Sequence, residues 1–108
     1  MTMTYHFKGE TDMNPDWSNP HDKYCDGIEA VAETIRERGK DYGSPLANHM
    51  EIARFWSVIL DQEITPSMVV QCMIAVKLAR IKHKEDHADS WHDIIGYAGL
   101  GQGFIKNE

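Results

Sequence analysis

Several polar residues occupy positions where a helix would carry apolar ones, and their types and spacing could support chemistry. In the segment 45–61, Asn48 and His49 fall inside the apolar arc of a helical wheel, and Glu51 lies at its margin. The arc consists of Ile52, Phe55, Trp56, Ile59 and Leu60. Burying such groups without partners costs on the order of a few kcal/mol each. They therefore either bond to nearby backbone or line a polar pocket.

A second polar feature is a basic stripe formed by Lys77, Arg80 and Lys84, at spacings of i, i+3 and i+7. On a surface helix such a stripe is simply solvated. Lys77, however, lies between Val76 and Leu78, so the stripe could also line a site for phosphate or carboxylate oxygens. Both interpretations remain open from the residues alone.

A carboxylate on an aromatic face is the third feature. Asp93 shares a helical face with Tyr97, Leu100 and Phe104, where it needs a cation, a metal or several hydrogen-bond donors. Asp89 lies one turn earlier, a position that the helix dipole favours by itself. Trp91, next to these residues, either packs in the core or stacks on a nucleobase.

These groups together suggest phosphate chemistry. If the helices face one cleft, Glu51, Asp89 and Asp93 could hold Mg²⁺ or Mn²⁺ through oxygen ligands, with Glu51 and Asp93 also acting as catalytic groups. Lys77 and Arg80 would then neutralise phosphates bridged by the metal, and a metal-activated water would attack. The pattern predicts a metal-dependent phosphohydrolase.

Four helices must position these residues. The apolar spacing predicts a helix over about 24–38 that stops at Gly39, with 39–43 as a tight connector. Ser44-Pro45 and Thr65-Pro66 are typical N-cap and first-turn pairs, and predict helices over about 45–61 and 66–84. A fourth helix is predicted to begin near Ser90 and to end among Gly99, Gly101 and Gly103.

The fold class that follows is all-α, a four-helix bundle. The segment from Met68 to Ile81 is apolar almost all round, so the third helix is expected to be central. Residues 1–23 lack helical periodicity and are predicted to be a flexible N-terminal tail, with the bundle domain over 24–108.

Composition excludes several functional classes. The 108 residues carry a formal net charge of -6, which argues against general nucleic-acid binding. No apolar run approaches the ~20 residues of a membrane span, and no signal-peptide core is visible. The chain is therefore expected to work in a cytoplasm.

Three blocks of sequence resemble a family of short tailed-phage proteins of unassigned function. They are Arg38-Gly-Lys-Asp-Tyr-Gly43, Lys77-Leu-Ala-Arg80 and Asp89-Ser-Trp-His-Asp-Ile-Ile-Gly-Tyr97. That family in turn distantly resembles the all-α nucleotide pyrophosphatases of the MazG and dUTPase type. The resemblance implies a helical bundle that forms homo-oligomers. It also implies Mg²⁺-dependent hydrolysis of nucleoside triphosphates to monophosphate and pyrophosphate.

The acidic motifs of the MazG type are only partly present. Asp93 matches the Asp of the ExxD motif, whereas Ser90 stands at the position of its Glu and Asp89 is displaced by one. Of the ExxE motif only Glu51 matches, because Asn48 occupies the other acidic position. This depletion leaves two possibilities, a pyrophosphohydrolase and a nucleotide-binding protein without catalysis.

The leading hypothesis is thus a MazG-like nucleotide pyrophosphohydrolase or nucleotide-binding protein of phage origin. In it, Lys40, Tyr42 and Asn48 would contact the sugar or the base, beside the phosphate contacts of Lys77 and Arg80. The alternative is a non-enzymatic phage accessory protein that binds a host protein or sequesters a nucleotide signal. Metal dependence would distinguish the two.

Overall fold

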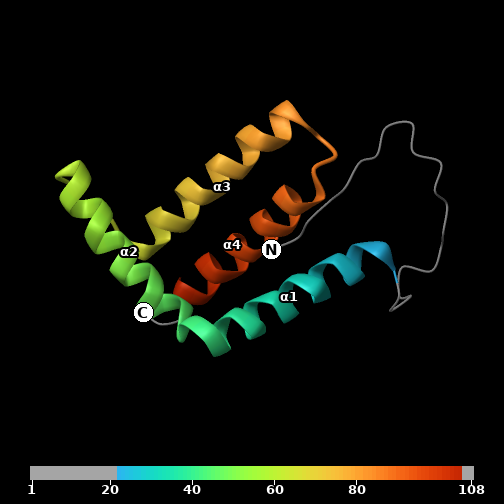
Figure 1. Ribbon diagram of the computed structural model, residues 1–108, viewed down its shortest axis with the longest axis horizontal. Helices are drawn as coiled ribbons and strands as arrows, with labels where there is room; N and C mark the ends of the chain where they lie inside the picture. Colours follow the sequence, from blue (N-terminus) through green and yellow to red (C-terminus); the bar gives the residue numbers. More distant parts are fainter. Residues whose placement is uncertain (1–21, 106–108) are drawn as a thin grey trace.

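The computed structural model describes residues 22–105, which form four α-helices and contain no strand. They are α1 (Lys23–Tyr42), α2 (Pro45–Leu60), α3 (Pro66–His83) and α4 (Ala88–Ile105) (Figure 1). The all-α prediction is confirmed. The tail predicted for residues 1–23 lies, except for its last two residues, outside the described part of the chain.

Side-chain caps set the helix starts, as the sequence predicts for α2 and α3. Ser44 Oγ accepts the Ala47 N–H at 3.4 Å, and Thr65 Oγ1 accepts the Met68 N–H at 3.2 Å. In both helices a proline follows the cap. A backbone N–H at this position has no partner within the helix, so proline, which lacks the N–H, costs no hydrogen bond there. Asp22 caps α1 in the same way, through a 2.7 Å bond from the Tyr24 N–H.

The predicted end of the first helix is wrong. α1 runs through Gly39 to Tyr42, and the turn comes at Gly43, whose φ of 77° favours glycine. The Gly43 N–H still donates to the Gly39 carbonyl at 3.0 Å. A glycine inside a helix costs only about 1 kcal/mol relative to alanine, so Gly39 alone does not stop it. The segment predicted as a connector is therefore the last helical turn, followed by Gly43.

The fourth helix also exceeds its predicted bounds. It begins at Ala88 because His87 caps it: His87 Nδ1 accepts the Ser90 N–H at 3.3 Å, and Ser90 Oγ lies 2.8 Å from the same nitrogen. The glycines near its end do not terminate it. A Cβ built at Gly101 would lie 3.3 Å from Val70 Cγ2, so this glycine lets α4 approach α3 closely.

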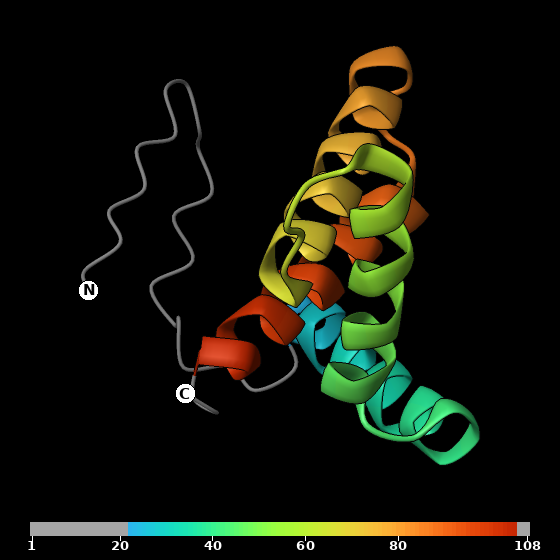
Figure 2. The ribbon, with the colours of Figure 1, turned by 90° about the vertical axis from the view of Figure 1, so that its left-hand side faces the viewer.

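α3 and α4 form an antiparallel hairpin and lie side by side in all three views (Figures 1 and 2). α1 packs against the side of α4 between His92 and Gly99, and leads through Gly43 into α2. α2 and α4 each contact all three other helices, α4 the more extensively, whereas α3 contacts only α2 and α4. The apolar girth of α3 predicts that α3 is central, but the central helix is α4.

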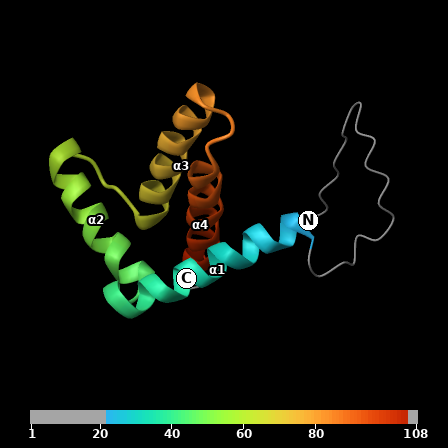
Figure 3. The same ribbon diagram turned by 45° about the vertical axis from the view of Figure 1, so that its right-hand side comes forward.

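The bundle is open on the side of α2. α2 and α3 diverge toward their C-terminal ends (Figure 3), and the Cα radius of gyration is 16.7 Å, against about 13 Å for a compact domain of 100 residues. The predicted apolar arc of α2 is consequently only partly buried. Ile52 and Trp56 are half-buried, but Phe55, Ile59 and Leu60 are exposed because no other described helix reaches them. Among the described helices, none combines the length and the hydrophobicity needed to cross a bilayer.

Candidate functional site

A cleft between α1, α2 and α4 consists of two adjoining cavities. The larger has a volume of about 610 Å³ and the smaller about 230 Å³. Four residues line both, and so join them into one feature: Ile35, Arg38, Tyr97 and Leu100. The larger cavity lies against the start of α2, and the smaller one extends along α4 to Lys77 of α3.

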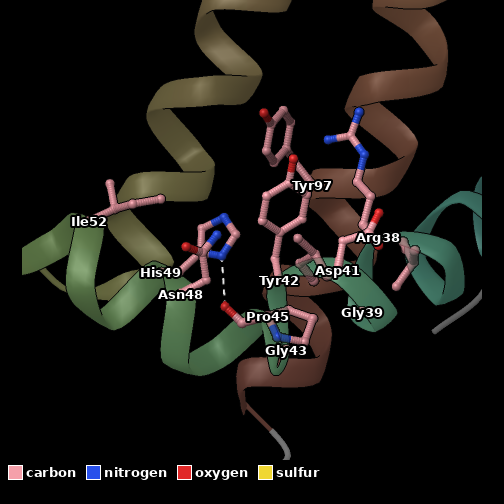
Figure 4. Close-up of a pocket in the computed structure, with 12 residues that line it drawn as sticks. Arg38, Gly39, Asp41, Tyr42, Gly43, Pro45, Asn48, His49, Ile52 and Tyr97 are labelled. Carbon is pink, nitrogen blue, oxygen red and sulfur yellow. Dashed lines mark hydrogen bonds between the residues drawn. The ribbon is translucent and has the colours of Figure 1, made fainter.

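The larger cavity has an aromatic side and an amide side. Figure 4 shows the rings of Tyr42, from the last turn of α1, and Tyr97, from α4, on one side of Asn48 and His49 of α2. Arg38 lies beyond the tyrosines, on α1. Tyr42 is largely exposed and Tyr97 is half-buried, so the rings reach from the rim of the cavity into its wall. Such a cavity can hold a flat, polar-edged ligand.

His49 is held by its own helix. Its side chain is buried, and Nδ1 donates to the Pro45 carbonyl at 2.8 Å, while the ring packs against Phe104 at a centroid distance of 5.5 Å. This confirms that a polar residue inside the apolar arc can be satisfied by backbone in the first helical turns. With Nδ1 protonated, Nε2 of the neutral ring remains as an acceptor beside the cavity.

In the smaller cavity, a lysine and a carboxylate form an ion pair. Lys77 Nζ lies 2.9 Å from Asp93 Oδ2, and their side chains are only 10% and 32% exposed. This pair explains how Asp93 tolerates the face that it shares with Tyr97 and Leu100, because the lysine supplies the cation that a shielded carboxylate needs. The sequence singled out both residues, but it did not pair them.

Thr34 and His92 form a second contact in this cavity. Thr34 Oγ1 lies 3.1 Å from the Ala30 carbonyl and 3.2 Å from His92 Nε2. The Thr34 hydroxyl has a single proton, which it donates in its hydrogen bond to the Ala30 carbonyl. The His92 ring must therefore be the donor to Thr34 Oγ1. The bond joins α1 to α4 directly beside the Lys77–Asp93 pair and holds this wall of the cleft in place.

The structure brings together four of the predicted site residues and leaves the others outside the cleft. Tyr42 and Asn48 line the larger cavity, and Lys77 and Asp93 line the smaller one. Five residues line neither cavity, all on exposed surface: Lys40, Glu51, Arg80, Asp89 and Trp91.

Two of these five have partners that explain their positions. Lys40 Nζ contacts Glu37 Oε1 at 3.2 Å on the solvent side of α1. Trp91 Nε1 donates to the Glu85 carbonyl at 2.9 Å and so fixes the connection between α3 and α4. Trp91 is half-exposed, so it is not a core residue, and it does not line the cleft.

The predicted metal ligands do not come together within one chain. Among residues 22–105, no three His, Cys, Asp or Glu side chains are close enough to hold a metal ion. Asp93 faces the cleft and contacts Lys77, whereas Glu51 and Asp89 are exposed on α2 and in the first turn of α4. The cleft instead contains a different carboxylate, Asp41, in the larger cavity.

Four residues of the cleft were missed from the sequence: Thr34, Arg38, Asp41 and His92. For Arg38 and Asp41, the error came from ending the first helix at residue 38. Arg38 and Tyr42 follow Val31 and Ile35 at i, i+4, i+7 and i+11, so they continue the inward face of α1. Extending that periodicity through Gly39 would have placed Arg38 on the inward face of the first helix.

The comparisons with known proteins point to phages. Residues 27–105 match the family described as a domain of unknown function, DUF6378. The chain is 44% identical over 63 residues to the Gene 55 protein of Mycobacterium phage D29, a match covering 58% of this chain and 42% of that protein. The Gene 55 protein of Mycobacterium phage L5 is 40% identical over 65 residues, covering 59% and 42%.

The chain thus spans less than half the length of these curated relatives. No solved structure matches it. The predicted resemblance to a phage protein family is confirmed, and none of these matches is to a MazG-type enzyme.

Proposed function

The chain belongs to the DUF6378 family, and we propose that it binds a nucleoside phosphate in the cleft between α1, α2 and α4. One observation carries the proposal: a single cleft is lined by two tyrosine rings, with an asparagine amide on one side of them and Arg38 on the other. An aromatic surface, a hydrogen-bonding side chain and a cation are the groups that suit a base linked to phosphate.

The larger cavity suits the base. Its volume of about 610 Å³ is within the range of roughly 300–1,000 Å³ typical of small-molecule sites. Tyr42 and Tyr97 offer rings on which a base can stack, and stacking on aromatic side chains is worth about 1–3 kcal/mol per base. The Asn48 amide can both donate to and accept from the edge of that base.

Arg38 suits the phosphate. It lines both cavities, and among the described residues it forms no ion pair, whereas Lys77 is already paired with Asp93. A guanidinium presents a planar fork of donors that matches phosphate oxygens. Arg38 therefore replaces Lys77 and Arg80 as the residue that we assign to the phosphate, because Asp93 balances the charge of Lys77 and Arg80 lies outside the cleft.

Hydrolysis to monophosphate and pyrophosphate is a second candidate, and one arrangement favours it. Two carboxylates, Asp41 and Asp93, line the same cleft as Arg38. Mg²⁺ is commonly held by one or two carboxylates together with substrate phosphates and waters, so a chain without a three-carboxylate cluster fits a substrate-bridged ion. When bound, the ion would neutralise the phosphate charge.

Thermal shift and pyrophosphate release test both candidates on the same samples. The full chain is mixed with ribo- and deoxyribonucleoside triphosphates, with Mg²⁺, with Mn²⁺ or with chelator. A nucleotide-induced thermal shift that occurs in chelator, without release of pyrophosphate in any sample, supports binding without catalysis. Release of pyrophosphate that needs the metal and that Asp93→Asn removes supports the enzyme. Neither a shift nor release with any nucleotide would contradict the proposal and favour an accessory protein that binds a host protein.

Replacing Arg38 gives a sharper test with a matched control on the same helix. Arg38→Gln should weaken nucleotide binding about tenfold to a hundredfold, since a charge-assisted hydrogen bond contributes about 1.5–3 kcal/mol. Arg36→Gln should leave the affinity unchanged, because Arg36 is exposed and contacts Glu33 at 3.5 Å. Calorimetric titration measures both variants. Equal affinities in the two would remove Arg38 from the site.

A further inference from the structure

One polar atom in the wall of the larger cavity has a fixed chemical character, and it is Nε2 of His49. The side chain is buried and its ring is held from two sides, by the bond from Nδ1 to the Pro45 carbonyl at 2.8 Å and by the contact with Phe104. Because a carbonyl can only accept, the proton of the neutral ring is on Nδ1. Nε2 is therefore a hydrogen-bond acceptor whose position and tautomer are both set by the protein.

This acceptor is open to the cavity. Among the described residues, the ring forms one hydrogen bond, which is the bond of Nδ1, so Nε2 has no partner there. Every fully buried side-chain nitrogen or oxygen in this part of the chain does have a partner, so Nε2 is not sealed inside the protein. Since His49 lines the larger cavity, a ligand that fills the cavity either supplies a donor to Nε2 or leaves this acceptor unpaired.

Asn48 stands next to this acceptor. The two residues are consecutive on α2, both line the larger cavity, and both lie on the same side of the tyrosine rings (Figure 4). The amide of Asn48 offers one donor group and one acceptor, and it can be turned over, whereas Nε2 of the neutral imidazole offers an acceptor alone. Together they present one donor and two acceptors to the edge of a base.

We propose that this pair of residues selects guanine, and that His49 determines the selection by accepting from the 2-amino group. The Watson–Crick edge of guanine carries the O6 acceptor, the N1–H donor and the 2-amino donor in that order. The Asn48 amide donates to O6 and accepts from N1–H, and Nε2 accepts from the amino group. The inference rests on the proposed binding of a nucleoside phosphate and names its base.

The other common bases leave at least one of these groups unpaired. In the same position, adenine presents a C–H to Nε2, and cytosine, uracil and thymine present the O2 acceptor. When adenine or cytosine is turned over so that its amino group reaches Nε2, the Asn48 amide faces a C–H and N1 of adenine, or two acceptors of cytosine. Guanine alone pairs with all three protein groups.

The places of the other side chains fit a guanine nucleotide in this orientation. The Watson–Crick edge of a purine lies at the end opposite N9, the atom that carries the sugar. Figure 4 shows Asn48 and His49 on one side of the tyrosine rings and Arg38 beyond them. A guanine that stacks on the tyrosines with this edge toward α2 therefore directs its sugar and phosphate toward Arg38 on α1.

Calorimetric titration of the full chain with guanosine diphosphate and inosine diphosphate, each with Mg²⁺, is the first test. The two ligands differ in the 2-amino group alone. The guanosine nucleotide should bind about tenfold to a hundredfold more tightly, because the inosine nucleotide leaves a shielded acceptor unpaired. Equal affinities, or binding of other nucleotides and not of this one, would overturn the inference and leave nucleotide binding standing. If no nucleotide binds, both proposals fail.

Replacing His49 tests whether Nε2 makes the distinction. His49→Phe keeps a ring against Phe104 and removes Nε2, so the two diphosphates should bind equally. The readout is the ratio of the two affinities, because a general loss of structure would lower both. Circular dichroism checks that the variant is folded, and the comparison on the unmodified chain stands without it.

Asn48→Ala is the matched control. Asn48 faces O6 and N1–H, which guanine and hypoxanthine share, so both affinities should fall by about the same factor and the preference for the guanosine nucleotide should remain. A preference that survives His49→Phe, or that Asn48→Ala removes, would contradict the role assigned to His49.

Discussion

At the scale of single residues, the cleft depends on how each buried polar group is satisfied. Asp93 is balanced by Lys77, His49 donates to backbone, and Thr34 bonds to His92. The sequence identified Asp93, Lys77 and His49 because each interrupts an apolar face. It could not show that Asp93 pairs with Lys77, because these residues lie on different helices and the pattern of a single helix does not determine how helices are rotated relative to each other.

The Lys77–Asp93 pair gives a prediction for stability. Asp93→Asn should lower the free energy of unfolding by about 1–3 kcal/mol, less than the ~3–5 kcal/mol seen when a fully buried pair is broken, because Asp93 is one-third exposed. The double variant Lys77→Met, Asp93→Leu should recover much of that loss, as apolar groups of similar size need no partner. Urea unfolding measures both. A double variant no more stable than Asp93→Asn would show that the pair is not coupled.

At the scale of elements, the helix starts were predictable and the ends were not. Ser44-Pro45 and Thr65-Pro66 act within two or three residues, so their effect can be read locally. Gly39 and the glycines of α4 look like stops in the sequence. Instead, Gly39 lies in the last turns of α1, and Gly101 serves the contact with Val70. Distinguishing these uses requires knowing which helix lies opposite.

Two glycines of α1 and its turn test this assignment of the helix end. Gly39→Ala should stabilise the protein by about 0.5–1 kcal/mol, since Gly39 is helical and a Cβ there meets no atom within 4 Å. Gly43→Ala should destabilise it by about 1–2 kcal/mol, because its φ of 77° strains any residue with a Cβ. Thermal unfolding reports the two signs. If both substitutions destabilised the protein, the result would indicate that the first helix ends at residue 39.

At the scale of the whole molecule, the four-helix class was predictable and the open shape was not. Helical periodicity indicates that Phe55 and Ile59 belong to an apolar face, and it does not say whether that face meets the same chain. In this structure it meets no described helix. The same openness leaves the cleft accessible between α1, α2 and α4.

The most direct test of the central claim, that the cleft binds a nucleoside phosphate, is to map binding by NMR. A ¹⁵N-labelled chain would be titrated with the nucleotide that gives the largest thermal shift. The amide shifts should change around Arg38, Asn48 and Tyr97, which line the cleft, and Arg38→Gln should abolish the changes at the same nucleotide concentration. Changes confined to surfaces outside the cleft, or none at saturating nucleotide, would contradict the account.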